Sequence, residues 1–337
     1  MNNTSEQTDT LTSGPEVSGE RAAPGLDSTR YNFIDYATQG YLLIVGLIVL
    51  LLDHGLEPWP LLLGAHAAGM LAVHGLVRGH ARWPKIRLLT FLRHFYPILF
   101  YTGFYRETGL LNHILVDGYL DGFFASLDQA LFEFQPAATL MARLPHTWLS
   151  ELFYASYFSY YVMIVGVGLA LYLQHRQRFF HYVSVVSFVF YVCYLNYIFL
   201  PVVGGRVFWS SIDGIPQEDL FDFYPLSFPE SVQAGPFFHI MDFIYEHFEA
   251  EGAAFPSSHV AVALVTLYFS HLYLRRIRHV HTVAVILLCI ATVYCRYHFV
   301  VDVFAGVIAG AALLWIGDLL FWKCQGLEPP AAEEVLD

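Results

Sequence analysis

The sequence predicts an all-α protein, a polytopic transmembrane helical bundle of about eight spans. Of its 337 residues, 56% are hydrophobic and only 14% are charged, whereas a soluble domain carries about 25% charged residues. One soluble core of this size cannot hide so much apolar surface. Apolar stretches close to the roughly 20 residues of a transmembrane helix recur along the chain, and basic residues cluster at alternate connections between them.

The elements follow in order along the chain. Residues 1–30 are rich in Ser, Thr, Gly, Glu and Pro and lack an apolar run, so we expect a disordered tail there. The rest divides into N-terminal transmembrane helices (31–105), a mixed surface or amphipathic segment (106–151), a core transmembrane domain (152–322) and a C-terminal tail (323–337). The eight candidate spans are 33–52, 59–77, 88–105, 152–173, 180–200, 258–274, 280–295 and 300–321.

The basic residues test this map, because Lys and Arg gather in cytoplasmic loops. Clusters follow the second, fourth and sixth spans, and Lys323 follows the eighth. With the N-terminus inside, all of them fall on the cytoplasmic side, and only Arg106, Arg143, Arg206 and Arg296 lie outside. The pattern supports eight crossings, including the weak third span, and predicts an integral protein of the plasma or inner membrane.

The composition also limits partners and cofactors. A formal net charge of −12 argues against nucleic acid, which requires a basic patch. The four cysteines lie in or beside apolar runs without metal-ligand spacing, so we expect buried thiols and no metal or cofactor. His239, Asp242, Glu246 and His247 suggest a metal site, but the aromatic residues among them favour a surface amphipathic helix, and the acidic loop 201–257 favours solvated surface.

Two short polar segments, 255–259 (Phe-Pro-Ser-Ser-His) and 296–302 (Arg-Tyr-His-Phe-Val-Val-Asp), lie where loops meet apolar stretches. The chain between them has the length of one helical hairpin, which would return His298 to the membrane face of His259. Arg206 and Arg296 are expected at the same outward face, against the usual sorting of basic residues. Two imidazoles, a carboxylate and arginines at one water–lipid boundary suggest phosphate-ester chemistry.

The spacing of His298 and Asp302 suggests roles for the histidines. Residues four apart share a face of a helix, and a carboxylate that accepts a hydrogen bond from one imidazole nitrogen leaves the other nucleophilic. His298 is therefore the candidate nucleophile, which would form a phosphohistidine. His259 is the candidate general acid for the leaving oxygen and then the base for the acceptor.

The phosphate oxygens have candidate ligands of their own. Arg206 and Arg296 would hold them and stabilise charge in the transition state. Ser257, Ser258 and the backbone N–H groups that open the sixth span could also bind phosphate, because a helix N-terminus attracts anions.

Each piece also has a structural explanation. Pro256, Ser257 and Ser258 form an ordinary helix start, with proline near the boundary and serine as a cap. His113 and Asp117 repeat the spacing of the His–Asp pair without a flanking arginine, and we interpret them as structural.

The segment 255–259 resembles the Pro-Ser-Gly-His motif of the type 2 phosphatidic acid phosphatase superfamily, and 298–302 resembles its His-x-x-x-Asp motif. Residues 196–201 (Asn-Tyr-Ile-Phe-Leu-Pro), followed by Gly-Gly-Arg at 204–206, resemble the first motif of an inositolphosphotransferase-like sub-branch that includes fungal inositol phosphorylceramide synthases. The resemblance covers roughly residues 90–320. It implies a six-helix core, metal-independent transfer through phosphohistidine, and the same roles for His298, Asp302, His259 and Arg206.

The chain departs from the superfamily pattern at several positions. Phe199 stands where a lysine is expected, no proline adjoins Arg206, and Ala291-Thr292 replaces a Ser-Arg pair. The third position of the Pro-Ser-Gly-His motif is Ser258. Replacement of the missing arginine by Arg296 is a hypothesis.

The predicted function is a phosphotransferase or phosphatase for a lipid phosphate ester, with its active site on the outer, non-cytoplasmic face. Either a lipid phosphatase or a phospholipid head-group transferase fits, and membrane lipids are the expected partners. A transporter or lipid-binding protein is the alternative, but it would distribute polar groups through the bilayer depth. A vanadium-dependent haloperoxidase shares the superfamily's phosphate-like site but does not fit a chain embedded fully in the membrane.

Overall fold

The computed structural model describes residues 30–52, 55, 57–209 and 228–326. These residues form thirteen helices, and within the described ranges the only β-structure is an isolated bridge between Val202 and Ala253. The predicted all-α class is therefore confirmed. The tails expected at 1–30 and 323–337 lie outside the described residues, apart from residue 30 and residues 323–326.

Eight long helices coincide with the eight expected stretches. They are α1 (Phe33–Leu51), α2 (Trp59–Arg82), α3 (Arg87–Leu111), α6 (Thr147–Gln174), α7 (Arg176–Phe199), α11 (Ser258–Tyr273), α12 (Arg278–Tyr294) and α13 (Val300–Cys324). Five of them, α1, α2, α6, α7 and α13, are long and apolar enough to cross a membrane. Helix α12 is apolar but has only 17 residues, and α3 contains Arg93 and Pro97. The protein is thus an integral membrane protein.

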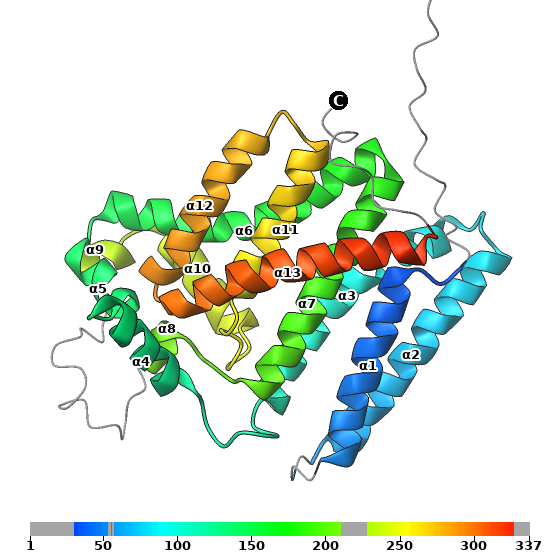
Figure 1. Ribbon diagram of the computed structural model, residues 1–337, viewed down its shortest axis with the longest axis horizontal. Helices are drawn as coiled ribbons and strands as arrows, with labels where there is room; N and C mark the ends of the chain where they lie inside the picture. Colours follow the sequence, from blue (N-terminus) through cyan, green and yellow to red (C-terminus); the bar gives the residue numbers. More distant parts are fainter. Residues whose placement is uncertain (1–29, 53–54, 56, 210–227, 327–337) are drawn as a thin grey trace, which may run out of the picture.

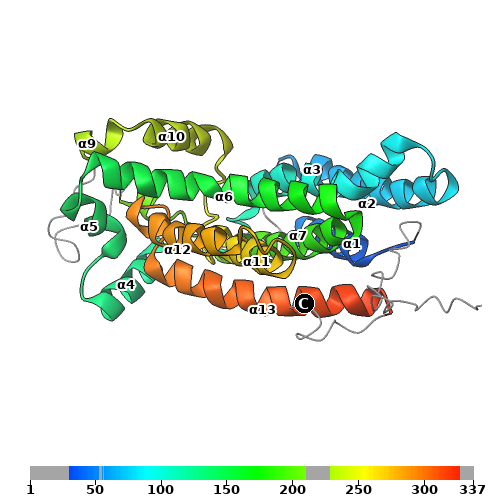
Figure 2. The same ribbon diagram turned by 90° about the horizontal axis from the view of Figure 1, so that it is seen from above.

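Helix α7 is the centre of the bundle. It packs against α1, α3, α6, α11 and α13, and buried side chains lie on nearly all of its faces, as expected for a helix enclosed by others. Figure 2 shows α13 along one long side of the molecule and α6 toward the opposite side, and Figure 1 shows the α1–α2 pair at one end.

Five shorter helices gather at the end of the bundle where α13 begins (Figure 1). They are α4 (Asp121–Phe132), α5 (Pro136–Arg143), α8 (Gly205–Phe208), α9 (Glu230–Gln233) and α10 (Pro236–Phe248). The segment expected at 106–151 therefore contains the last turn of α3, then α4 and α5, and then the first turn of α6. The expected surface helix is α10, which buries Phe238 and Met241 and exposes Glu246 and His247, together with Phe243 and Phe248.

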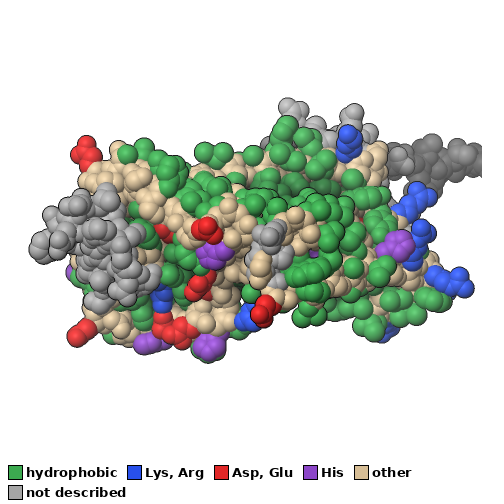
Figure 3. All heavy atoms as spheres, turned by 90° about the horizontal axis from the view of Figure 1, so that it is seen from below, with side chains coloured by type: hydrophobic (Ala, Val, Ile, Leu, Met, Phe, Trp, Pro, Cys, Tyr) green, Lys and Arg blue, Asp and Glu red, His purple; other side chains and the backbone are tan. Residues whose placement is uncertain are grey.

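Charge is distributed unevenly along the molecule. The face in Figure 3 shows Lys and Arg mostly at the end where α13 finishes, acidic side chains toward the end where it begins, and hydrophobic side chains between them. Exposed basic residues at the first end include Arg78, Arg82, Lys85 and Arg87, around the α2–α3 connection. This segregation agrees with the predicted sorting of basic residues.

Two glycines allow α13 to pack directly against the backbone of α11. A Cβ atom on Gly306 would lie 2.7 Å from the Ser257 carbonyl oxygen, and one on Gly310 would lie 2.7 Å from Ala261 Cα. Small residues permit such close approach between membrane helices. The Gly306–Gly310 face is therefore used within the chain, and it draws the start of α13 against the start of α11.

Candidate active site

His259 and His298 meet where the α11–α12 hairpin returns the chain to the start of α13. His259 lies in the first turn of α11, and His298 lies in the connection between α12 and α13. Their ring centroids are 5.7 Å apart, with the ring planes inclined at 62°. His298 is 3% exposed, whereas His259 is only partly buried, so a substrate would reach the pair from the side of His259.

His298 has a different neighbour at each ring nitrogen. Its Nε2 lies 3.1 Å from Ser257 Oγ, and its Nδ1 lies 3.5 Å from Asp302 Oδ2. Burial lowers the pKa of His298 to about 4, against an opposing effect of the Ala254 backbone. The imidazole is therefore neutral near pH 7, which is the form that can act as a nucleophile.

Asp302 connects three parts of the site. Its Oδ2 accepts a hydrogen bond from the Phe299 N–H (2.9 Å), and its backbone carbonyl accepts one from the Ser257 N–H (3.2 Å). The expectation that His298 and Asp302 share one helix face is wrong, because α13 begins only at Val300. The two side chains still approach each other because the chain turns into the helix between them.

Tyrosines of α6 surround His259. The Tyr157 hydroxyl lies 3.1 Å from His259 Nε2, and the Tyr160 ring centroid lies 4.5 Å from the imidazole. Tyr157 also stacks on Tyr297, with ring centroids 4.3 Å apart. Sequence reasoning missed these tyrosines, because in an apolar span they resemble ordinary core residues.

Arg206 is held at the same end of the bundle by α8. It forms an ion pair with Asp242 of α10, and its Cζ atom lies 4.7 Å from the ring centroid of Tyr245 and 5.6 Å from that of Tyr297. Because Tyr297 stacks on Tyr157, which contacts His259, one aromatic layer connects Arg206 with the histidine pair. Asp242, one of the residues that suggested a metal site, thus forms an ion pair with an arginine.

Arg296 occupies an unusual backbone conformation. Its φ angle is 65°, in the left-handed region that a residue with a side chain adopts only when its surroundings enforce it. Its Nη2 donates to the Ala138 carbonyl (3.3 Å), and its Cζ lies 5.2 Å from the Phe228 ring, which Arg206 also approaches. Burial, together with the charge of Arg206, lowers the pKa of Arg296. Both guanidinium groups thus lie beside the Phe228 ring, and their positive charges would attract an anion to this region.

A buried carboxylate positions the loop that carries Arg206. Asp121 accepts hydrogen bonds from the Val203 and Gly204 N–H groups, at 2.9 and 2.8 Å. Gly204 has a φ angle of 82°, and a Cβ there would lie 2.1 Å from the Tyr297 carbonyl oxygen. The Arg206 loop therefore rests on the turn that carries His298, and only glycine fits at the contact.

A second carboxylate of α4 caps the helix that carries Asp302. Asp128 accepts hydrogen bonds from the N–H groups of Val300 (2.8 Å) and Val301 (3.0 Å). These donors in the first turn of α13 have no partner within the helix. Asp121 and Asp128 were not predicted, because acidic residues of a mixed segment are usually solvated.

The two expected serines have different roles in the structure. Ser257 caps α11 through a bond from the Val260 N–H and also faces His298. The Ser258 N–H donates to the Tyr197 hydroxyl (3.2 Å), so this group is already occupied in the structure. The other histidine with an aspartate four residues later, His113, instead contacts Val116 and Tyr119.

Comparison with known proteins adds the family. Residues 123–316 match the family model of the PAP2 superfamily, which is more than half of the chain. The chain belongs to the PAP2 superfamily. No curated protein and no solved structure matches it. The PAP2 match runs from α4 into α13 and includes every predicted site residue, while α1, α2 and α3 precede it.

PAP2 membership supports a phosphatase- or phosphotransferase-type activity on lipid phosphates. The structure shows where two residues that depart from the expected PAP2 motifs lie. Phe199 is 41% exposed at the end of α7. Thr292 is buried in α12, where its carbonyl accepts hydrogen bonds from the N–H groups of Tyr297 and His298.

Proposed function

We propose that this protein cleaves a lipid phosphate ester through a phosphohistidine on His298, at a site on the non-cytoplasmic face. The main support is the approach of the His259 and His298 rings to 5.7 Å. Ser257 Oγ lies 3.1 Å from His298 Nε2, the proposed nucleophile. A phosphate oxygen could take the position of this hydroxyl beside Nε2. The other proposed phosphate ligands are Arg206, Arg296 and Ser258.

The first half-reaction would form the phosphohistidine. With its proton on Nδ1, toward Asp302, His298 would attack phosphorus through the Nε2 lone pair. The new N–P bond forms as the bond from phosphorus to the leaving oxygen breaks, and His259 gives that oxygen a proton. A bound phosphate anion beside His259 favours the protonated imidazole that this step requires.

The second half-reaction would release the phosphate. His259, now neutral, takes a proton from the acceptor, whose oxygen attacks phosphorus as the N–P bond breaks. Water as acceptor would make the protein a lipid phosphatase. An alcohol would make it a head-group transferase, as in the inositolphosphotransferase-like sub-branch whose first motif the segment 196–206 resembles.

A lipid substrate fits the position of the site. His259 is partly buried at the start of an apolar helix, and the neighbouring α6 spans 28 residues. A phosphate at His259 could therefore be held while its acyl chains stay in the bilayer. A soluble phosphate ester would gain nothing from this placement.

The transporter alternative has weaker support. Polar pairs do occur elsewhere among the described residues: His66 with Glu107 (3.3 Å), which is buried, and His181 with Asp318 (2.7 Å), which is partly buried. Each joins two helices and lacks an adjoining pair of arginines. Family membership and the clustering of His259, His298 and Arg206 at one end favour an enzyme.

Trapping of the intermediate tests the proposal. Purified wild-type protein, His298→Asn and His259→Asn would be mixed with a phosphorus-labelled lipid phosphate that has a good leaving group, then quenched. We expect acid-labile, base-stable label on wild-type protein, more label on His259→Asn, and none on His298→Asn. His113→Asn is the matched control, because it has the same spacing to an aspartate, and it should behave as wild type. Label on a serine or aspartate, or normal turnover by His298→Asn, would refute the mechanism.

A further inference from the structure

A polar cavity lies far from the histidine pair. It has a volume of about 290 Å³ and is lined by Asn32, His80, Pro84, Thr90, His94, Arg176, Gln177 and Phe180. Arg176 begins α7, whereas Tyr197, near the other end of α7, contacts Pro256 and Ser258 beside the proposed active site. A helix rises 1.5 Å per residue, so about 30 Å of α7 separates the two places.

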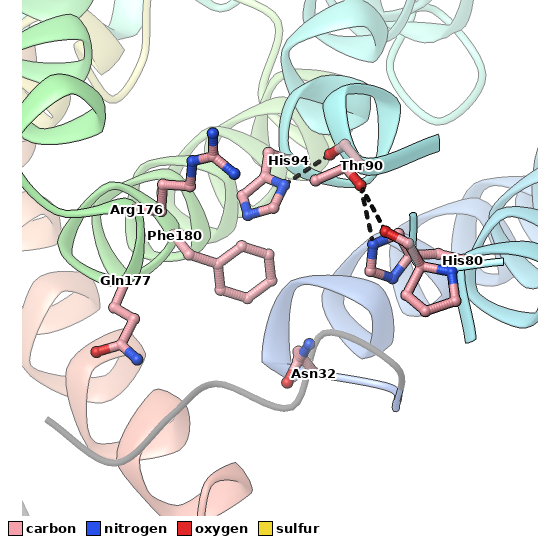
Figure 4. Close-up of a pocket in the computed structure, with 8 residues that line it drawn as sticks. Asn32, His80, Thr90, His94, Arg176, Gln177 and Phe180 are labelled. Atoms are coloured by element: carbon pink, nitrogen blue, oxygen red, sulfur yellow. Dashed lines mark hydrogen bonds between the residues drawn. The ribbon is translucent and has the colours of Figure 1, made fainter. Parts of the chain in front are cut away.

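The side chains around this cavity are suited to an anion. Arg176 contributes a guanidinium group, His80 and His94 contribute imidazoles, and Thr90 contributes a hydroxyl group. Figure 4 shows Arg176 and His94 side by side, with Thr90 between His94 and His80. His94 Nδ1 contacts the Thr90 carbonyl at 2.7 Å. This contact fixes the ring and leaves Nε2 for a ligand. None of the described residues that line the cavity is a carboxylate.

Asp35, an acidic side chain near the cavity, is already neutralised. Asp35 is fully buried and accepts hydrogen bonds from Arg93 (2.8 and 2.6 Å), the Tyr96 hydroxyl (2.7 Å) and the Asn32 N–H (2.7 Å). Arg93 Cζ in turn lies 5.6 Å from the ring of the lining residue Phe180. The Asp35–Arg93 pair therefore supports the cavity without offering a negative charge to its contents.

The cavity also lies in a basic, lipid-facing region. Residues 74–94 and 171–180 contain no acidic residue, and Arg82, Lys85 and Arg87 are exposed beside it. Leu88 and Phe91, which flank Thr90 on α3, are 64% and 49% exposed, and Leu173 at the end of α6 is 74% exposed. Apolar side chains exposed next to cationic ones are typical of a membrane surface with anionic lipids.

We propose that this cavity binds the phosphate group of an anionic phospholipid, at a site separate from the proposed active site. Arg176 would pair with the phosphate oxygens, and Gln177 would donate a hydrogen bond to them. Thr90 would donate another once its hydroxyl turns from the Pro84 and Ile86 carbonyls, and His94 would be stabilised in its protonated form. The acyl chains would lie against Leu88 and Phe91. Free phosphate shares the recognised chemistry, and the exposed apolar residues favour the lipid.

Photolabelling tests the proposal without depending on catalysis. Full-length protein carrying His298→Asn, which keeps the labelled lipid intact, would be reconstituted in phosphatidylcholine vesicles with a photoreactive phosphatidic acid. Labelled peptides would be located by mass spectrometry. We expect label on the peptides that begin α3 and α7, reduced about tenfold by Arg176→Gln combined with His94→Gln, a loss of about 1.4 kcal/mol. Arg276→Gln, exposed at the same end but outside the cavity, should leave the label unchanged.

Two further experiments distinguish a phospholipid from free phosphate and can refute the proposal. Competition by millimolar inorganic phosphate would show that the phosphate group alone is recognised, while label that persists would assign the site to the whole lipid. Equal labelling by a photoreactive diacylglycerol, which has no phosphate, would refute the proposal. So would undiminished labelling of the Arg176→Gln, His94→Gln protein once its helical content is shown to match the parent.

Discussion

Arg206 of α8 and Asp242 of α10 form an ion pair. The arginine proposed to bind substrate phosphate is thus held by a carboxylate in the described structure. Aromatic rings hold it as well, since its Cζ lies 4.7 Å from the Tyr245 ring centroid and 5.0 Å from that of Phe228. A substrate phosphate would have to share Arg206 with Asp242 or displace Asp242 from it.

Neutralising Asp242 should therefore help an anionic substrate to bind. We expect Asp242→Asn to lower KM for a lipid phosphate about two- to fivefold with little change in kcat, because a partly exposed ion pair contributes about 0.2–1 kcal/mol. Steady-state kinetics in mixed micelles would measure this. Glu246→Gln, an exposed acid of the same helix, is the control and should change neither constant. A higher KM would show instead that Asp242 orients Arg206 for the substrate.

The pH dependence of kcat/KM should reflect the burial of His298. Burial lowers the pKa of His298 to about 4, so the neutral nucleophile persists as the pH falls below 6.5, the ordinary histidine value. Because kcat/KM reports the free enzyme, the contribution of His298 should stay constant from pH 7 to about 5 and fall only near pH 4. A decrease in kcat/KM centred near pH 6.5 would have to belong to His298 if substitution of no other titratable residue removed it. That result would contradict a buried, neutral His298.

Asp128 should act through its effect on the start of α13. We expect Asp128→Ala to destabilise the protein by about 1–2 kcal/mol, because two backbone N–H groups lose their acceptor. Activity should also fall, because Asp302 and His298 would be displaced. Asp128→Asn keeps one acceptor oxygen and should recover part of the lost stability and activity. Thermal unfolding in detergent and kcat would be measured together. Glu133→Gln, an exposed acid just after α4, is the control.

The contact between α11 and α13 should tolerate no larger residue at position 310. A Cβ there would lie 2.7 Å from Ala261 Cα, so Gly310→Val would force the helices apart at a cost of about 1–3 kcal/mol. We expect lower thermal stability and loss of most activity, because His259 and His298 lie at the ends of these helices. Ala311 is the next residue and is exposed, so Ala311→Val is the control and should be tolerated. Wild-type stability of Gly310→Val would exclude this packing.

Much of the site could be predicted because its histidines lie at the ends of apolar stretches. The lengths of those stretches fix the number of crossings between His259 and His298, and hence their common end of the bundle. The same reasoning could not find Asp121 and Asp128, whose partners are backbone N–H groups of distant segments. Nor could it find Tyr157 and Tyr160, which in an apolar helix resemble core residues.

By itself, the sequence determined the helical class, the positions of the long helices and the end at which the polar motifs meet. Apolar length and basic sorting are properties of continuous segments, so they can be read locally. Only the tertiary structure decided that Asp242 pairs with Arg206, that Asp128 caps α13 and that Gly310 contacts Ala261. Each of these contacts joins elements far apart along the chain, and their geometry depends on how the helices pack rather than on any one segment.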